Sequence, residues 1–502
     1  MSQKLAICGG SVLALLLATT AVQADVTAEQ VWNNWKALIA ANGPTVTAGS
    51  ETKTGDTLVI RDVTLSSETK DAKISGTMAE IDLREQGDGS VAVTMSPEWP
   101  VDMTVTPPEG KPTEMQMKFS QSGLRMVVSG SPGNMNYSYE IPSFAVKMDG
   151  MKADGKDVDL TVDIGLTGMK GQNLVKGTET RTTASSGRAD ALSYTVSAKN
   201  PDGKGTFDAK GKLTGLTFTS NATLVGKMDM ADMNAALQAG LAMDASFSYA
   251  SSQMTSDFSD KGSQMHSETS GGGGTLDFAF DKNRLKYGAS GKDMKMTFSG
   301  SQIPMPQVTV QMTEAAFNLL MPTSKSDTPQ DFGLLVKLAG LKVNDEVWSM
   351  IDPQKVLPRD PATLVVDLAG KANWLFDIFD PAQQKAPPKE PIKLHEVTLK
   401  NLDVAAAGAE LTGTGSFTFD NSDTTTFNGM PKPTGAVDLK LVGGNGLIDN
   451  LVKMGLVPAD QASGARMMLG LFARPGDGPD TMVSKIEVTP EGEVLANGQR
   501  LQ

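Results

Sequence analysis

Apolar and polar residues alternate along much of this chain, and that two-residue period restricts the fold more than any other feature of the sequence. The clearest examples are residues 135–141 and 158–166, in which nearly every second residue is a large apolar one. Successive side chains of a strand point to opposite faces, so such segments bury one face and expose the other, as antiparallel strands do. Turn residues such as those at 87–89, 132–134 and 202–203 separate the runs. We therefore expect a meandering antiparallel sheet over residues 56–226.

Segments with a helical period interrupt this alternation. Thr27 and Gln30 have the spacing of a capping box, and they open a helical apolar stripe that includes Trp32 and Trp35. The polar segment 251–274, which ends in four glycines, is expected to be a long flexible hairpin loop. Further helices are expected over 228–242, 313–321, 345–351, 446–455 and 459–473.

The predicted fold class is mainly β (α+β), with large curved antiparallel sheets in two lobes and a few packing helices. Residues 25–227 form the first lobe, a helix followed by antiparallel strands. Residues 228–502 form the second lobe, which is rich in strands and contains the remaining helices. The helix expected at 228–242 marks the boundary between the two lobes.

The first 24 residues have the pattern of a Sec-type signal peptide. A basic start that ends at Lys4 precedes an apolar run over 5–21, and small residues before Asp25 favour cleavage after Ala24. An uncleaved membrane anchor is the alternative, but the run is shorter than the roughly 20 residues that a span needs. We expect a periplasmic protein. Cleavage would also remove Cys8, the only cysteine, so the mature chain would have neither a disulfide nor a thiolate site.

The chain is acidic, with a formal net charge of −13. Phosphate backbones and anionic lipid surfaces repel such a chain, so we expect no nucleic-acid partner. No segment after the leader is apolar enough to predict a transmembrane helix. The acidity by itself is most simply a contribution to solubility.

The sequence offers little catalytic chemistry. Its two histidines, His266 and His395, belong to no zinc-binding motif and have no Gly-x-Ser-x-Gly elbow to accompany them. Ser67 to Lys70 match a Ser-x-x-Lys motif, but a strand context does not suit that motif. Carboxylates are plentiful, yet no pair stands out as a glycosidase would require. We therefore predict a protein that is not an enzyme, without catalytic residues, cofactor or metal.

Methionine is abundant, with 28 residues, and several of these continue the alternation of strands. Methionine fills wide apolar spaces without demanding one shape, so these residues are typical of a packed core or of an adaptable ligand groove. Copper binding by paired thioethers, including those at 228–233, is a third interpretation. The residues predicted to line an apolar groove are Met115, Met117, Phe119, Met294, Met296 and Phe298.

Several motifs resemble those of one bacterial family. They lie at 326–332, 347–353, 357–362, 374–381 and 494–498, and the opening at 25–32 is similar as well. Together they resemble the exported proteins of domain-of-unknown-function family 2125 from Gram-negative bacteria. The strand-rich chain and its final Asn-Gly hairpin also resemble, more distantly, the AsmA-like proteins, whose curved sheets are associated with lipid handling. Residues in these motifs that we interpret as fold determinants are Trp348, Pro358, Arg359, Asp360, Pro361, Asn497 and Gly498.

These observations predict a non-catalytic periplasmic envelope protein that binds a lipid or another apolar ligand along a groove of its sheet. With so few helices, part of an apolar sheet face can remain uncovered, and such faces usually mark binding surfaces. The alternative is a structural or assembly factor of the cell envelope with a filled core and an envelope protein as partner. A hydrolase-type enzyme is the third possibility.

Overall fold

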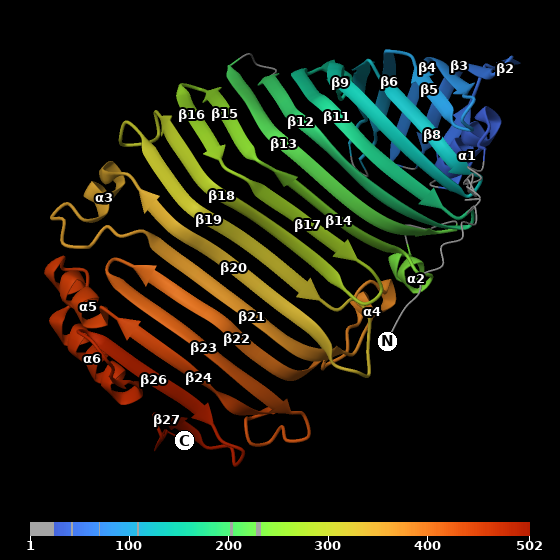
Figure 1. The fold of residues 1–502 in the computed structure, drawn as a ribbon. Helices are drawn as coiled ribbons and strands as arrows, with labels where there is room; N and C mark the ends of the chain where they lie inside the picture. The colour runs from blue at the N-terminus through green and yellow to red at the C-terminus, as the bar shows by residue number, and fades with distance from the viewer. Residues whose placement is uncertain are drawn as a thin grey trace, which may run out of the picture.

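In the part of the chain that the computed structural model describes, 28 antiparallel strands form one sheet, and the mainly β fold is confirmed (Figure 1). The structure describes residues 25–41, 44–69, 71–107, 110–200, 204–226 and 232–501. The strands are β1 (Thr45–Thr47), β2 (Ser50–Thr54), β3 (Thr57–Glu68), β4 (Ala72–Glu85), β5 (Val91–Met95), β6 (Glu98–Val105), β7 (Thr113–Ser122), β8 (Arg125–Ser131), β9 (Asn134–Ala153), β10 (Lys156–Asp157), β11 (Asp159–Lys176), β12 (Thr180–Lys199), β13 (Gly205–Val225), β14 (Ala242–Tyr249), β15 (Ser251–Asp260), β16 (Ser263–Gly271), β17 (Gly274–Phe280), β18 (Leu285–Gly300), β19 (Val308–Met321), β20 (Gln330–Val343), β21 (Ala362–Trp374), β22 (Ile392–Ala406), β23 (Ala409–Asp420), β24 (Lys432–Val442), β25 (Arg474–Pro475), β26 (Thr481–Val488), β27 (Val494–Ala496) and β28 (Gln499–Arg500).

Helices stand at the ends and edges of this sheet. In the described part of the chain, none of them is both long and apolar enough to cross a bilayer. The predicted helices at 345–351, 446–455 and 459–473 are confirmed within a few residues at each end. The helices are α1 (Ala28–Ala41), α2 (Met233–Gln238), α3 (Asp345–Ile351), α4 (Pro381–Lys385), α5 (Gly444–Lys453) and α6 (Ala459–Phe472).

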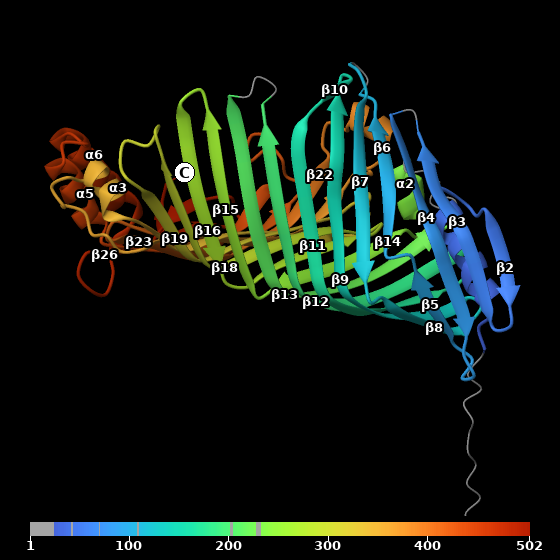
Figure 2. The ribbon, with the colours of Figure 1, turned by 90° about the horizontal axis from the view of Figure 1, so that it is seen from above.

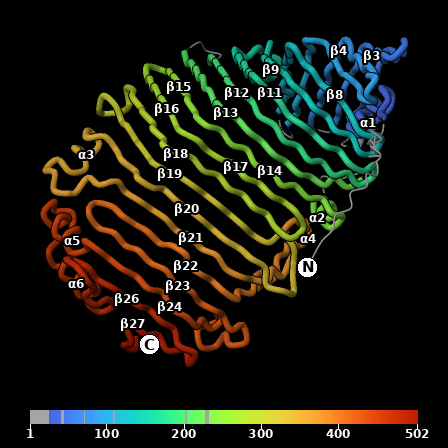
Figure 3. Tube along the Cα trace, in the orientation of Figure 1, coloured from blue at the N-terminus to red at the C-terminus, as the bar shows by residue number. Residues whose placement is uncertain are grey.

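The strands follow each other across the sheet in nearly the order in which they occur in the chain (Figure 3). From β9 onwards each long strand pairs with the next one, as β11 does with β12 and β12 with β13. In several places two shorter strands share one position. The strands β14 and β15 both pair with β13, and β16 and β17 both pair with β18. The predicted meander is therefore confirmed, and it continues through the second half of the chain.

The sheet is bent along a line that crosses the strands, which we call the crease. It passes between β14 and β15, where they pair with β13, and between β16 and β17, where they pair with β18. Residues with a left-handed backbone mark the crease within the unbroken strands, as Asp62 (φ 51°) does in β3, Gly168 (φ 63°) in β11 and Gly340 (φ 66°) in β20. A left-handed residue in a strand acts as a bulge and bends it. Figure 2 shows the bend: the halves of the strands around β7, β11 and β15 rise as a wall, and the halves around β8 and β14 form a floor.

The crease also moves the apolar alternation by one residue. In β3, Leu58 and Ile60 precede the left-handed Asp62, whereas Val63 and Leu65 follow it. Ile60 and Val63 are nevertheless buried in the same cluster. The left-handed residue thus keeps the apolar side chains of wall and floor on one side of the sheet. We call the side on which α1 packs the inner face.

The fully buried core lies at the N-terminal end of the inner face, beneath α1. The capping box is confirmed, because the backbone N–H of Thr27 donates to Gln30 Oε1 (3.0 Å) and that of Gln30 to Thr27 Oγ1 (3.3 Å). Val31 and Trp32 are almost inaccessible to solvent, and they pack on floor residues such as Leu83. This packing is what the two tryptophans of the sequence predict.

Two predicted segments are wrong. Residues 313–321 belong to strand β19 and not to a helix. The prediction failed because the crease places Met312 and Ala315, three residues apart, on the same face of the strand, and this spacing imitates a helical period. Residues 251–274 form strands β15 and β16 and the first residue of β17. A tight turn at Lys261-Gly262 joins β15 to β16. Their serines and threonines obscured the alternating Met254, Phe258 and Met265.

The helix predicted over 228–242 is shorter than expected. It covers Met233–Gln238, and β14 begins at Ala242; residues 227–231 lie outside the described part of the chain. This helix does not interrupt the sheet, since β13 before it pairs directly with β14 after it. The described strands consequently form one continuous sheet rather than two. The boundary between folding units at residue 228 stays a prediction.

Candidate functional site

The inner face of the floor carries an almost unbroken row of apolar residues from one end of the sheet to the other. Each member pairs directly with the next across neighbouring strands, so all of them share one face. The floor row consists of Leu58, Leu83, Val93, Met126, Tyr139, Gly171, Gly187, Phe218, Phe247, Leu276, Ala289, Phe317, Val336, Val366, Leu402, Gly413 and Leu439.

A second row runs in parallel along the wall. Like the floor row, it is held in register by direct cross-strand pairs. The wall row consists of Trp99, Phe119, Val146, Ile164, Tyr194, Gly211, Met254, Thr269, Met296, Val310 and Val343.

All six residues predicted to line a groove lie on the wall. Phe119 and Met296 are members of the wall row itself, and the other four lie beside them on the inner side of β7 and β18. Seven strand-to-strand steps of about 4.8 Å separate β7 from β18, roughly 34 Å along the sheet. The prediction therefore found two distant parts of one face rather than one compact site. Their role in binding stays a prediction.

Aromatic rings lie over glycines at several points of the inner face. A Cβ atom added to Gly187 would lie 2.4 Å from the ring of Phe218, and one added to Gly211 would lie 2.5 Å from Tyr194. The same arrangement joins Tyr139 to Gly171. Glycine lets each ring lie flat against the neighbouring strand, which fixes register and keeps the face smooth.

The cover of the inner face differs along its length. Leu58 and Leu83 are buried under α1, whereas farther along the floor Leu276 is 43% exposed and Phe317 38%. Large apolar side chains with this degree of exposure continue towards the C-terminal end. We call this part the open stretch, and it consists of Leu276, Tyr287, Phe317, Leu338, Leu364 and Val404.

The outer face is polar. Hydroxyl groups pair across its strands, as Thr217 does with Ser248 (2.6 Å) and Thr275 with Ser290 (2.8 Å). Ion pairs lie between them, among them Lys170 with Glu140, whose Nζ and Oε1 atoms are 2.7 Å apart. The two faces of one sheet thus have opposite character, and the apolar one is only partly covered.

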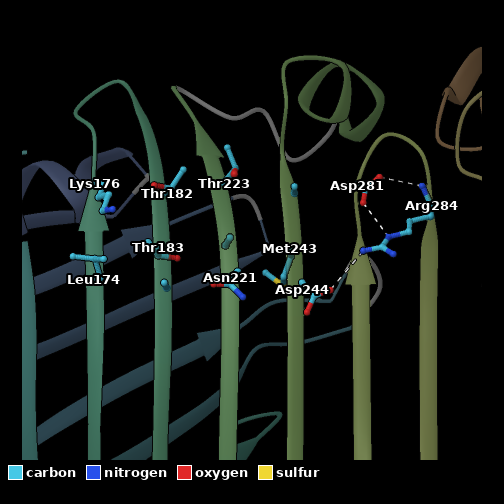
Figure 4. A pocket seen from close by; sticks show the side chains of 13 residues that line it. Leu174, Lys176, Thr182, Thr183, Asn221, Thr223, Met243, Asp244, Asp281 and Arg284 are labelled. Carbon is cyan, nitrogen blue, oxygen red and sulfur yellow. Dashed lines mark hydrogen bonds and ion pairs between the residues drawn. The ribbon is translucent and has the colours of Figure 1, made fainter. Parts of the chain in front are cut away.

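A hollow of about 460 Å³, lined mostly by polar residues, lies at the C-terminal ends of β11 and β13 and the N-terminal ends of β12 and β14 (Figure 4). Arg284 extends across it towards two carboxylates, with 3.3 Å from its Nε to Asp281 and 3.7 Å from its Nη2 to Asp244. Both carboxylates therefore share one cation. A pair engaged in this way is poorly suited to act as general acid and base.

The histidines do not assemble a catalytic site with each other. His266 lies on the exposed surface of β16 between Asp257 (2.7 Å) and Glu268 (3.4 Å), and hydrogen bonds to these carboxylates raise its pKa. His395, on β22, contacts the side chain of Asn373. The side-chain partners of both rings are carboxylates or an amide rather than a hydroxyl nucleophile. Among the described residues, no group of three His, Cys, Asp or Glu residues is arranged to hold a metal ion.

The predicted fold determinants around 345–361 gather at α3. Arg359 Nη1 lies 2.5 Å from Asp345 Oδ1, and its guanidinium group lies over the ring of Trp348. The partner of Arg359 is therefore on helix α3. Beside it, Asp352 is fully buried; burial opposes its charge, but backbone hydrogen bonds, including one from Leu357, hold its pKa below the usual value.

The other five determinants lie outside helices and strands. Pro358 packs beside Gly408, and Asp360 and Pro361 lead into β21. Asn497 (φ 50°) and Gly498 (φ 81°) form the two-residue turn between β27 and β28, which requires left-handed residues at both positions. Their importance for folding stays a prediction.

Comparison with known proteins identifies a family for the C-terminal part of the chain. Residues 292–489 match the family described as uncharacterized protein conserved in bacteria, DUF2125. The similarity to this family is limited to that region. The predicted family is thus confirmed there, whereas the resemblance to AsmA-like proteins is not confirmed. No curated protein matches the chain. The matched region starts within β18 and ends just after β26, so it holds much of the open stretch and α6.

Proposed function

We propose that this protein is a non-catalytic periplasmic protein that binds a lipid, or another elongated apolar ligand, along its inner face. The observation that carries the proposal is the open stretch. A row of apolar side chains that is continuous across many strands leaves about two fifths of Leu276 and Phe317 in contact with water. Exposed apolar surfaces of this extent are typical of binding sites.

The shape of the open stretch suits a long, flexible ligand. It crosses six strands, β17 to β22, and is flanked by the apolar wall, so a hydrocarbon chain could lie across the strands over about 24 Å. Each methylene removed from water contributes about 0.8 kcal/mol, so about ten of them contribute on the order of 8 kcal/mol before the cost of ordering the chain. Apolar contact alone could therefore hold such a ligand.

The same exposure favours ligand binding over the alternative of a structural factor with a filled core. A filled interior would leave the floor residues as inaccessible as Leu83 is under α1. An assembly factor whose partner covers the inner face is the second candidate. In that case the inner face would bind a protein partner, whereas in the first case it would bind a lipid or another elongated apolar ligand.

The test compares two neighbouring residues of β17 that point to opposite faces and are both exposed. Leu276→Glu places a carboxylate in the open stretch, and Thr275→Glu places the same group on the outer face as the matched control. Native mass spectrometry and lipid extraction on gently purified protein would follow bound lipid. We expect stoichiometric lipid on the unaltered protein and on Thr275→Glu, with a large loss on Leu276→Glu. A lipid-free mass for all three would contradict the proposal.

A further inference from the structure

The floor row ends beneath α6 in a cavity of about 620 Å³. Helix residues line it at positions three and four apart, which is the spacing of one helical face. The opposite wall of the cavity is the inner face of β23, β24 and β26. The lining residues are Leu411, Leu439, Leu441, Ala465, Met468, Leu469, Phe472, Ala473, Met482, Ser484 and Ile486.

This lining offers almost no polar partner to a ligand. Its one polar side chain, Ser484, already donates its hydroxyl hydrogen to the carbonyl oxygen of Phe472 (2.6 Å). The strands behind the cavity have neighbours on both sides, since β24 pairs with β23 and β26, and β23 also pairs with β22. A peptide bound here would leave its N–H and C=O groups unpaired, which is costly in apolar surroundings. A hydrocarbon chain has no such groups.

The cavity is continuous with the open stretch. Leu411 in its lining pairs directly with Val404 of β22, and Val404 pairs directly with Leu364 of β21. Val404 and Leu364 are both members of the open stretch. A chain that lies along the open stretch therefore meets the cavity without crossing polar surface.

Helix α6 covers this end of the sheet without filling it. Ala462 is the only residue of α6 that is buried, and Met468 remains 53% exposed at the mouth of the cavity. The helix is joined to α5 by an ion pair of Arg466 Nη2 with Asp449 Oδ1 at 2.6 Å. A space of several hundred cubic ångströms is in the range of small-ligand sites.

We propose that the cavity under α6 holds the end of one lipid acyl chain, while the rest of that chain lies along the open stretch. This proposal rests on the function proposed above. It adds a specific site and a direction: the methyl end of the chain lies at the C-terminal end of the sheet. The contacts of the chain end are then made by α6 and by the inner side of β24 and β26.

The experiment uses a 16-carbon fatty acid with a diazirine at its terminal carbon. It is photolysed with the purified protein after expression of the full chain, and the adducts are located by peptide mass spectrometry. Ala465→Trp fills the cavity from the helix, and Ser484→Phe fills it from the sheet. Met467→Trp is the matched control, because Met467 lies on the same helix but is 76% exposed and outside the cavity. Thermal melting verifies that each variant is folded.

We expect adducts of the unaltered protein and of Met467→Trp to fall in peptides that contain Leu439, Leu469 or Met482. A filling variant that melts normally should lower their yield about tenfold. Adducts confined to β17–β21, unchanged in both filling variants, would overturn this site and leave binding along the open stretch intact. An absence of adducts from every protein would contradict the proposed function as well.

Discussion

Two helices of equal length lie on the inner face at opposite ends of the sheet, and they cover it very differently. Both α1 and α6 have 14 residues. In α1, Ala28, Val31 and Trp32 are buried against the floor, whereas in α6 only Ala462 is buried. The N-terminal helix thus completes a core, and the C-terminal helix leaves a cavity. A covering helix on this sheet can therefore either complete a core or leave a space beneath it.

The sequences of the two helices account for the difference. Helix α1 has a side-chain cap and anchors Trp32 through its Nε1, which donates to Glu51 Oε1 (2.7 Å). Helix α6 starts after Pro458 without a side-chain cap, and it contains Gly464 and Gly470, which weaken a helix. Because α6 has low intrinsic helix stability and few buried side chains, its stability depends on its contacts with the sheet beneath it.

The largest difference should appear when one buried side chain is removed from each helix. Trp32→Ala should lower the free energy of unfolding by about 3–5 kcal/mol, because it leaves a large cavity in the α1 core. Leu469→Ala, in the half-buried face of α6, should lower it by less than about 2 kcal/mol. Urea unfolding followed by circular dichroism measures both. Equal losses would contradict the contrast between the two ends.

Alkaline pH should weaken the α1 end selectively. Burial raises the pKa of Tyr137 to about 12, and its hydroxyl group lies 3.2 Å from Asn34 Oδ1 of α1. Because the folded state holds this proton more tightly than the unfolded state, its contribution is complete below pH 10 and is lost as the pH rises towards 12. The loss amounts to about 2–3 kcal/mol. Unfolding measured from pH 9 to 12 should show this slope, and Tyr137→Phe should reduce it.

One substitution, glycine to alanine, should have opposite signs in the sheet and in α6. Gly187→Ala forces a methyl group against the ring of Phe218 and should destabilise the protein by about 1–3 kcal/mol. Gly464→Ala meets no atom within 4 Å, so it should stabilise the protein by about 0.5–1 kcal/mol through better helix propensity. Thermal melting of both variants tests the difference. A gain in stability from both substitutions would contradict the close packing of Phe218 on Gly187.

The smallest effect concerns the cap of α1. Thr27→Ala removes the hydroxyl group that accepts from the backbone N–H of Gln30 and should cost about 1 kcal/mol. Pro458→Ser, which offers α6 a side-chain cap, should give a change of similar size in the opposite direction. Amide hydrogen exchange of the first turn of each helix provides the readout. Unchanged exchange in both helices would mean that caps do not explain their different packing.

Much of the fold could be predicted from the sequence because its local signals are strong. The capping box at Thr27 fixed the start of α1, and the unbroken alternation over 158–166 fixed the first half of β11. The errors arise where the crease shifts the alternation. Around Thr313 two apolar sets with different phase follow each other, and each is regular on its own. If the alternation that contains Met312 and the one that contains Phe317 are analysed separately, each has the two-residue period of a strand, and together they predict one strand with a crease.

The candidate site was predictable only in part. Phe119 and Met296 were recognised because they stand in clean alternation, and both lie on the inner face. Leu276 and Phe317, which belong to the open stretch, give the same local pattern as any half-buried strand residue. What distinguishes them is the lack of a covering element, which depends on residues far away in the chain. The cavity under α6 depends in the same way on how far the helix stands from the sheet.

The most direct test of an apolar ligand on the inner face is photocrosslinking inside the cell. A benzoylphenylalanine residue would replace Phe317 in the open stretch, and in a second protein it would replace its neighbour Asn318, which faces the outer side of β19. Mass spectrometry of the purified proteins would identify the adducts. We expect a lipid-sized adduct at position 317 and much less at 318. Equal labelling at both positions, or protein adducts alone at 317, would contradict a lipid-binding inner face.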